Sequence, residues 1–285
     1  MPIRYGLSAG ALCGRLKVAT AALCLAAGAA QAQDEVPFIT TPDSVTLVML
    51  EMAGVSATDR LIDLGSGDGR IVITAAKRFG ARGLGVEIVP DLVARSRVHA
   101  RNAGVAAQVD FRVQDLFETD LGSASVITMY LLPEVNLQLR PRLLALAAGT
   151  RIVSHDWDMG DWRPDQTRTL DVPDKAIGRD KRSSVHLWVV PARVQGRWCG
   201  SGAQIDIQQR FQSFSATLTV PGLAAPVAVF DGRVSANTLL APDATNMPVA
   251  RLQLDGGGLR LISAVGAAAR FEGGRFTASS QGSCP

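Results

Sequence analysis

A ten-residue stretch, LIDLGSGDGR at Leu61–Arg70, constrains the fold more than any other part of this chain. Its apolar first half ends in three alternating glycines, Gly65, Gly67 and Gly69, and an apolar helical pattern follows. This order of features predicts a buried strand, a tight turn and the first turn of a helix. Glycine allows the sharp turn and the close approach of a ligand to the backbone, because it has no Cβ to collide.

The charge around this turn separates two kinds of cofactor. A helix start binds anions through its free N–H groups, but the carboxylates of Asp63 and Asp68 repel phosphate and attract an ammonium or sulfonium ion. The spacing is G-x-G-x-G, whereas a dinucleotide fingerprint is G-x-G-x-x-G. Glu87, at the end of the second expected strand, suits ribose hydroxyls in either case. S-adenosylmethionine therefore fits the turn better than a nicotinamide or flavin cofactor, and an oxidoreductase is the weaker alternative.

Residues 1–32 have the pattern of a secretory signal peptide. Arg4, Arg15 and Lys17 precede a short apolar stretch that closes on Ala30-Gln31-Ala32. This stretch is too short and too rich in alanine for a spanning helix. We expect cleavage after Ala32 and an exported protein, periplasmic or associated with the inner membrane. Membrane contact is expected only through the leader, if it stays uncleaved.

The charge of the chain without this leader is balanced. The whole sequence has 29 Lys and Arg against 26 Asp and Glu, and three of the basic residues lie in the leader. No run of basic residues interleaved with aromatic residues follows it. We therefore expect no nucleic-acid partner. The spacing of His, Cys, Asp and Glu predicts no metal site.

The cysteines agree with export. Cys13 and Cys24 belong to the leader, and Cys199 and Cys284 bracket the C-terminal region. In an oxidising compartment the second pair would form a disulfide that clasps this region. Two unrelated thiols are the alternative.

Strand and helix patterns alternate from the leader to about residue 191. The expected helices are one that opens at Thr41–Pro42 and ends at Gly54, then Arg70–Phe79, Asp91–Ala103 and Glu134–Ala147. The expected strands are Arg60–Leu64, Arg82–Ile88, Gln108–Val113, Ser125–Tyr130, Thr150–His155 and Ser184–Val190, the last of them a candidate antiparallel edge strand. This α/β alternation predicts a parallel sheet with helices on both faces, which binds ligands beyond the carboxyl ends of its strands.

From Ala192 onward the helical periodicity disappears. Short alternating segments lie between glycine-rich turns, at Ala203–Gln209, Phe211–Val220, Pro226–Phe230, Val249–Asp255 and Leu259–Ala264. They predict a small antiparallel barrel or sandwich without catalytic residues. The expected organisation is thus a signal peptide at 1–32, a catalytic α/β domain at 33–191 and an all-β domain at 192–285.

With these residues in view, the region from Pro37 to about Pro164 resembles the class I S-adenosylmethionine-dependent methyltransferases, which have a Rossmann-like sheet. It is most similar to the lysine N-methyltransferases related to the ATP-synthase c-subunit enzyme. The matching segments are Pro37–Pro42, Asp63–Val72, Gly85–Glu87 and Asp91–Arg97, and Tyr130–Ser154 is similar to the non-SET histone-lysine methyltransferases. The resemblance covers about half of the chain.

The resemblance implies roles for residues on the first two strands. Asp63, Gly65 and Gly67 would surround the methionine part of S-adenosylmethionine, and Glu87 would accept the ribose hydroxyls. A purely structural role for the two carboxylates is the weaker alternative, because a buried carboxylate is costly without a partner.

Four further residues complete the implied cofactor site. Asp115 would face the adenine amino group and Leu116 would pack on the ring. Thr40 and Thr41 resemble a segment that closes over the cofactor. For Asp115 the structural alternative is stronger, since this residue is also placed to cap a short helix.

For methyl transfer, the enzyme mainly has to align the acceptor with the methyl group and exclude water from the site, because the sulfonium is already an activated methyl donor. A lysine nucleophile must be neutral, which desolvation and a nearby proton acceptor favour. Tyr130 is the candidate for positioning the amine, and His155 and Asp156 are candidates for proton acceptance or substrate contact. A satisfied structural histidine is the main alternative for His155. Trp157 and Trp162 either wall the acceptor channel or cover the sheet.

The leading interpretation is a methyltransferase that acts on a lysine of a protein, membrane proteins included, or else on a small molecule. The expected leader conflicts with it, because free S-adenosylmethionine is not expected outside the cytosol. Three accounts are open: the leader persists as an anchor, the cofactor binds before export, or the chain is an exported, non-catalytic binding protein on a methyltransferase fold.

Overall fold

The computed structural model describes residues 39–176, 180–279 and 284. The expected signal peptide and the first residues of the Pro37–Pro42 segment lie outside these ranges. Within them, no helix is both long and apolar enough to cross a membrane.

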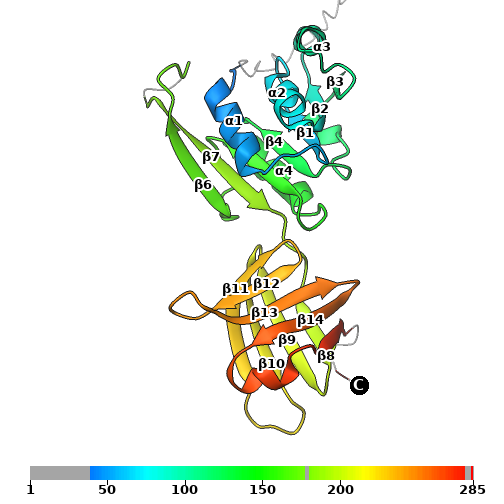
Figure 1. The fold of residues 1–285 in the computed structure, drawn as a ribbon, viewed down its shortest axis with the longest axis vertical. Helices are drawn as coiled ribbons and strands as arrows, with labels where there is room; N and C mark the ends of the chain where they lie inside the picture. The colour runs from blue at the N-terminus through cyan, green and yellow to red at the C-terminus, as the bar shows by residue number, and fades with distance from the viewer. Residues whose placement is uncertain (1–38, 177–179, 280–283, 285) are drawn as a thin grey trace, which may run out of the picture. The chain divides into compact units, whose positions relative to one another are not determined.

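A seven-stranded mixed sheet forms the first domain (Figure 1). Its strands are β1 (Arg60–Leu64), β2 (Arg82–Glu87), β3 (Val109–Val113), β4 (Val126–Met129), β5 (Arg151–His155), β6 (Gln166–Asp171) and β7 (Arg182–Val189). They lie in the order β3-β2-β1-β4-β5-β7-β6. β1 to β5 are parallel, and β7 is antiparallel to both of its neighbours. The predicted methyltransferase-type sheet is confirmed.

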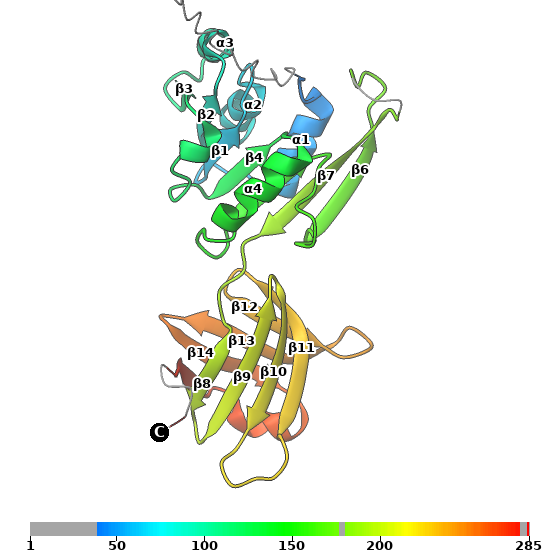
Figure 2. The same ribbon diagram turned by 180° about the vertical axis from the view of Figure 1, so that it is seen from behind.

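Four helices cover both faces of this sheet, as predicted (Figure 2). They are α1 (Asp43–Met52), α2 (Arg70–Phe79), α3 (Pro90–Asn102) and α4 (Pro133–Leu143). α1, α2 and α3 bury their apolar sides in one core, and α4 buries Leu139 and Leu143 in the core of the opposite face. Proline in the first turn of α3 and of α4 costs no hydrogen bond there, since those N–H groups have no partner within a helix.

In the first domain, one strand was not expected and one helix ends early. β6 was not expected, because its sequence QTRTLD is almost entirely polar and exposed, and it occupies the sheet edge that was assigned to β7. α4 ends at Leu143 rather than at Ala147, where i→i−3 hydrogen bonds replace the helical ones, as from Ala145 N to Arg142 O.

The second domain is a closed barrel of eight antiparallel strands, which decides between the predicted barrel and sandwich. The strands are β8 (Gly196–Gly200), β9 (Ala203–Arg210), β10 (Ser213–Thr219), β11 (Ala228–Ser235), β12 (Thr238–Pro242), β13 (Pro248–Asp255), β14 (Gly258–Ala264) and β15 (Arg275–Ala278). Its interior is filled by apolar side chains, among them Trp198, Phe214 and Phe276.

Three of these strands, β8, β12 and β15, were not expected from the sequence. Two glycines allow neighbouring barrel strands to approach closely. A Cβ at Gly200 would lie 2.1 Å from Arg275 O, between β8 and β15, and one at Gly232 would lie 2.1 Å from Leu240 O, between β11 and β12. Glycine is required wherever one backbone approaches another this closely.

Cys199 on β8 and Cys284 form a disulfide that closes a segment of 85 residues. The predicted clasp is confirmed, and the alternative of two unrelated thiols is wrong.

Candidate active site

The candidate residues gather at one edge of the sheet, where the parallel strands reach their carboxyl ends. Asp63 lies on β1 and Glu87 ends β2, while Asp115 follows β3, Tyr130 follows β4 and His155 ends β5. In α/β sheets this edge is where ligands bind, and the residues come together there because all five strands run in the same direction.

The glycine turn leads from β1 into α2 and is attached to β2. Gly65 and Ser66 both donate their N–H groups to Val86 O, at 3.0 and 2.9 Å. Gly65 has a φ of 73°, and a Cβ there would lie 2.9 Å from the side chain of Leu131. A residue with a side chain would thus be strained and would press on the loop after β4.

The second half of the turn is held by Glu87 and by packing. Gly67 N donates to Glu87 Oε2 at 3.0 Å. Gly69 has a φ of 81°, and a Cβ there would lie 2.7 Å from the Phe111 ring. The three glycines therefore fix the turn in a conformation that exposes backbone rather than side chains to a ligand.

Asp63 is buried, and among the residues that the structure describes it has no cationic partner. It is 2% exposed, and Thr128 Oγ1 donates to Asp63 Oδ1 at 2.7 Å. Burial raises its pKa to about 7; the hydrogen bond from Thr128 opposes this, and the charges of Glu87 and Asp68 add to it. Among the described residues, no Lys or Arg forms an ion pair with Asp63. A carboxylate placed this way is suited to receive an ammonium group, which is what the amino acid part of S-adenosylmethionine carries.

Asp68, in contrast, is not free to face a ligand. The guanidinium of Arg70 binds both of its oxygens, Nε at 3.0 Å from Oδ1 and Nη2 at 2.8 Å from Oδ2. Burial alone would raise the pKa of Asp68, but Arg70 outweighs it and holds the pKa below its usual value. Asp68 is therefore an ionised carboxylate bound by Arg70, and its charge contributes to the raised pKa of Asp63. Arg70 also donates to Thr41 O at 3.0 Å, which ties the turn to the segment before α1. Thr40 precedes this contact, half-buried.

Glu87, at the end of β2, lies next to the glycine turn. Each Glu87 oxygen accepts one backbone hydrogen bond, Oε2 from Gly67 N and Oε1 from Val89 N at 3.1 Å. A carboxylate oxygen can accept two, so one acceptor position on each remains for hydroxyl groups. Ile88, which follows, is 62% exposed although apolar. The sequence analysis did not identify Ile88 as a site residue. Its position directly after the acidic residue Glu87 was the signal that could have found it.

Asp115 caps a short helix, which is the structural role that the sequence also allowed. It is exposed, and its Oδ1 accepts from Phe117 N at 2.8 Å, which caps the 3₁₀ helix η1 (Leu116–Glu118). Leu116 is half-buried against the apolar core. Beside them, Val113 at the end of β3 presents an exposed apolar side chain. Together with Ile88, these residues form an apolar surface beside the Asp115 carboxylate, which is suited to accept a hydrogen bond from an amino group.

The predicted acceptor residues meet around a buried histidine. The ring of His155 lies 3.9 Å from that of Tyr130, centroid to centroid. Its Nδ1 is 3.3 Å from Thr41 Oγ1 and its Nε2 is 3.0 Å from Ser183 Oγ. Burial lowers the pKa of His155 to about 4 against the opposing charge of Asp156. The imidazole is neutral at physiological pH, and its contacts are those of a residue that positions its neighbours.

Asp156 carries the negative charge of this cluster. It has a φ of 61°, and Ser184 N donates to its Oδ1 at 3.0 Å. Its Oδ2 lies 3.5 Å from His155 Nε2 and 2.8 Å from Lys175 Nζ. Burial and the charge of Asp156 raise the pKa of Tyr130, so that its hydroxyl stays protonated. The cluster thus already holds one primary ammonium group, that of Lys175.

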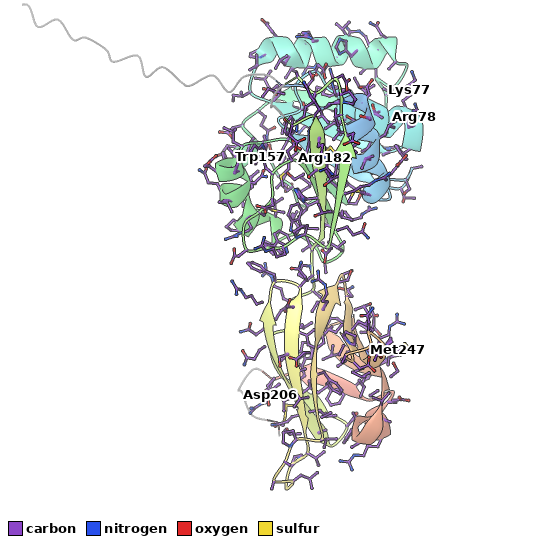
Figure 3. The ribbon with its side chains drawn as sticks, turned by 90° about the vertical axis from the view of Figure 1, so that its left-hand side faces the viewer. Lys77, Arg78, Trp157, Arg182, Asp206 and Met247 are labelled. Atoms are coloured by element: carbon purple, nitrogen blue, oxygen red, sulfur yellow. A yellow bond between two sulfur atoms is a disulfide. The ribbon has the colours of Figure 1, made fainter. Side chains whose placement is uncertain are left out.

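The two tryptophans of this region have different surroundings. Trp157, labelled in Figure 3, is 44% exposed directly after Asp156. Trp162 is fully buried, and Trp188 Nε1 donates to its carbonyl at 2.8 Å. Trp162 is therefore a core residue and not the wall of a channel, whereas Trp157 is placed to line one.

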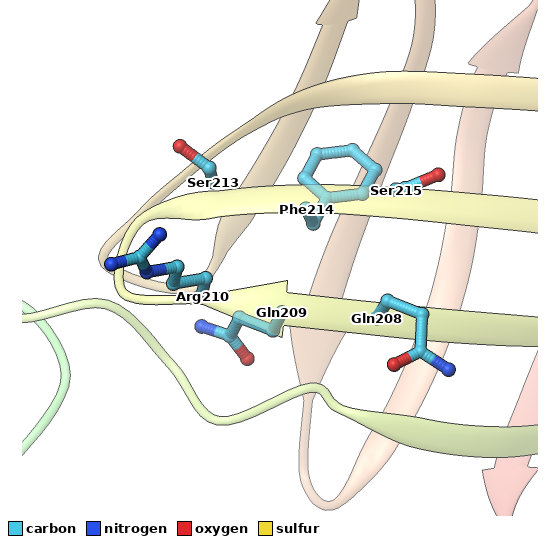
Figure 4. Close-up of a pocket in the computed structure, with 6 residues that line it drawn as sticks. All are labelled: Gln208, Gln209, Arg210, Ser213, Phe214 and Ser215. Carbon is cyan, nitrogen blue, oxygen red and sulfur yellow. The ribbon is translucent and has the colours of Figure 1, made fainter.

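A hollow on the barrel is lined by side chains that are less suited to catalysis. It lies at the β9–β10 hairpin and is lined by Gln208, Gln209, Arg210, Ser213, Phe214 and Ser215 (Figure 4). It contains neither a carboxylate nor an imidazole or thiol. Within the described part of the chain, no group of His, Cys, Asp and Glu could hold a metal ion.

Comparison with known proteins places this site in context. The sequence model of the ANTKMT methyltransferase domain matches residues 63–166. A protein-lysine N-methyltransferase of Saccharolobus islandicus is 42% identical over 131 residues, which are 45% of this chain and 81% of that protein.

Two mammalian relatives match over shorter regions. The adenine nucleotide translocase lysine N-methyltransferase of Mus musculus is 39% identical over 37% of this chain and 46% of its own length. The ATP synthase c-subunit lysine N-methyltransferase of Homo sapiens is 37% identical over 37% of this chain and 45% of its own length. The chain therefore spans about half the length of these mammalian relatives.

Among solved structures, an RNA methyltransferase from Salinibacter ruber in complex with S-adenosyl-L-homocysteine is 52% identical. It covers 55% of this chain and 96% of its own, with a TM-score of 0.49.

Proposed function

We propose that a protein lysine is the methyl acceptor of this chain, which belongs to the family of S-adenosylmethionine-dependent protein-lysine N-methyltransferases. One observation carries the proposal: Asp156 holds a primary ammonium group and lies next to His155, whose ring packs on Tyr130 at the carboxyl ends of the parallel strands. A site that accepts one lysine ammonium is suited to accept another.

The cofactor side of the proposal rests on residues of β1 and β2. Asp63 would receive the ammonium of the amino acid part, since its burial leaves it in need of a cation. The backbone of Gly65 and Gly67 would lie along this part, and Glu87 would accept the ribose hydroxyls through its remaining acceptor positions. When bound, S-adenosylmethionine supplies a methyl group on a positively charged sulfur.

The acceptor side rests on Tyr130, His155 and Asp156. Asp156 would attract the incoming ammonium, and the Tyr130 hydroxyl would orient the nitrogen once it is neutral. His155 is held between Thr41 and Ser183 and packs against the Tyr130 ring, so we assign it a positioning role. Its low pKa makes it a poor proton acceptor, and the proton of the ammonium would leave to water.

The connection between the two sides runs through Thr41. Its carbonyl accepts from Arg70 in the glycine turn, and its hydroxyl contacts His155 in the acceptor cluster. Ordering of this segment over the cofactor would align the acceptor nitrogen with the methyl group and exclude water, which is the main contribution that such an enzyme makes.

The test is transfer of a labelled methyl group from S-adenosylmethionine to a mixture of proteins and RNA by the purified protein. We expect label in protein, recovered as methyllysine after hydrolysis. Asp63→Ala should abolish the transfer, while Asp110→Asn should not, because Asp110 is exposed on β3 and pairs with Arg112 at the surface.

Three results would contradict the proposal. Label in RNA would assign a nucleic-acid acceptor instead, and label in a small molecule would favour the second acceptor class. Binding of the cofactor without any transfer would favour the non-catalytic alternative.

Export of the protein is a second proposal. The leader-like residues 1–32 and the disulfide between Cys199 and Cys284 both support an oxidising compartment. Mass measurement of the N-terminus after cell fractionation tests it. An intact first residue together with a cytosolic location would contradict it.

A further inference from the structure

Lys175 brings an amine of this chain into the acceptor cluster. It lies in the connection between β6 and β7, and its Nζ donates to Arg182 O at 2.6 Å and lies 2.8 Å from Asp156 Oδ2. Its side chain is only 14% exposed. Lysine is rarely buried this far, because its ammonium loses hydration, so the position needs the Asp156 carboxylate as compensation.

This amine touches the same group that would bind a substrate. Asp156 Oδ2 is shared between Lys175 Nζ and His155 Nε2, and His155 in turn packs on Tyr130. Through Thr41 the cluster is joined to the glycine turn. Lys175 therefore binds the carboxylate that the proposed function assigns to the acceptor lysine.

The small number of lysines in the chain sets Lys175 apart. The chain has only four lysines, Lys17, Lys77, Lys175 and Lys181, against 25 arginines. Lys77 is exposed near the end of α2 (Figure 3), and Lys181 is exposed and donates to the Lys175 carbonyl. Of the three lysines that the structure describes, only Lys175 presents its amine to the cluster.

We propose that Lys175 occupies the acceptor site of its own molecule and is methylated there in cis. This inference rests on the proposed function. The ammonium first loses a proton to water, and the neutral Nζ then gives its lone pair to the methyl carbon. The N–C bond forms as the C–S bond breaks, and the sulfur keeps that electron pair as a neutral thioether. The new ammonium carries one methyl group in place of one proton.

The test is incubation of the purified full chain with S-adenosylmethionine, in the presence and absence of an added protein mixture. Intact mass and peptide mapping follow the modification. We expect methyl groups on Lys175, with a rate per molecule that does not depend on protein concentration. Lys175→Arg should abolish the modification, since it keeps the positive charge beside Asp156 but removes the amine. Lys77→Arg and Lys181→Arg are the matched controls and should leave it unchanged.

A second variant tests the role of Asp156. Asp156→Asn should slow methylation of Lys175 by about tenfold or more, the effect of losing a hydrogen bond to a charged group. Binding of S-adenosylhomocysteine, measured by calorimetry, should stay unchanged in this variant, because Asp156 belongs to the acceptor side.

The outcomes separate this inference from the proposed function. Methylation of added proteins with Lys175 unmodified would overturn the inference and leave the function standing. Modification that moves to Lys77 or Lys181, or that rises with protein concentration, would also overturn it. Absence of transfer to any acceptor would overturn both.

Discussion

Replacing Asp63 by asparagine should change how the stability of the protein depends on pH. The pKa of Asp63 is raised by burial from 3.8 to about 7, so the folded state holds a proton that the unfolded state releases. Stability from this group is fully present below about pH 4 and is lost as the pH rises towards 7. Asparagine does not titrate and keeps an acceptor for Thr128, so the variant lacks this loss.

The magnitude follows from the pKa difference. About three pKa units correspond to about 4 kcal/mol of unfolding free energy, reached at a slope of about 1.4 kcal/mol per pH unit. The unpaired amide N–H of asparagine adds a cost of its own, but this cost does not vary with pH. The difference between variant and wild type should therefore rise by about 4 kcal/mol between pH 4 and pH 7 and then level off.

The assay is urea unfolding at a series of pH values, followed by tryptophan fluorescence. Trp157, Trp162 and Trp188 lie in the α/β domain and report on its unfolding. Asp110→Asn, at an exposed site, serves as the control and should show a constant difference from wild type. Parallel pH profiles for wild type and Asp63→Asn would refute the reasoning, because they would mean that Asp63 is ionised in the folded protein without a cation.

Three further predictions concern the site and the barrel. Binding of S-adenosylhomocysteine should weaken by about tenfold per pH unit below pH 7, because a protonated Asp63 offers no charge to the ammonium; calorimetry at several pH values checks this, and a flat profile would speak against it. Gly69→Ala should lower stability by about 1–3 kcal/mol more than Gly104→Ala does, the usual cost of overpacking a core. Both glycines have positive φ, but only at Gly69 would the new methyl group meet a ring, that of Phe111, and equal thermal shifts would exclude this clash. Cys199→Ser should destabilise the barrel by about 2–5 kcal/mol, since it opens the clasp to Cys284; urea unfolding measures this, and an unchanged midpoint would show that the disulfide contributes nothing.

The parts of the fold that local sequence determines were predictable. β1 and α2 have the predicted bounds, because an apolar run, glycines and a helical period lie next to one another in the sequence. β6 was not predictable in this way, since Leu170 is its one apolar residue and the strand is placed by pairing with β7. The closure of the barrel at Gly200 depends on β8 and β15, two strands that are distant in sequence.

The candidate site was likewise predictable where the sheet topology places its residues, and not where side-chain contacts do. The topology of a parallel sheet was enough to bring Asp63, Glu87, Tyr130 and His155 to one edge. The pairing of Asp68 with Arg70 was not predicted, because it depends on side-chain conformations that the glycine pattern does not determine. The contact between Lys175 and Asp156 depends on the pairing of the β6–β7 hairpin with β5, which no local sequence pattern indicates.

The central claim is that one sheet edge holds a sulfonium cofactor and an amine acceptor side by side. A crystal structure with S-adenosylhomocysteine tests it most directly. We expect the ligand's amino group on Asp63, its ribose on Glu87 and its sulfur facing Tyr130 and Asp156. A ligand whose sulfur points away from Tyr130, or whose amino group leaves Asp63 without a partner, would contradict the account.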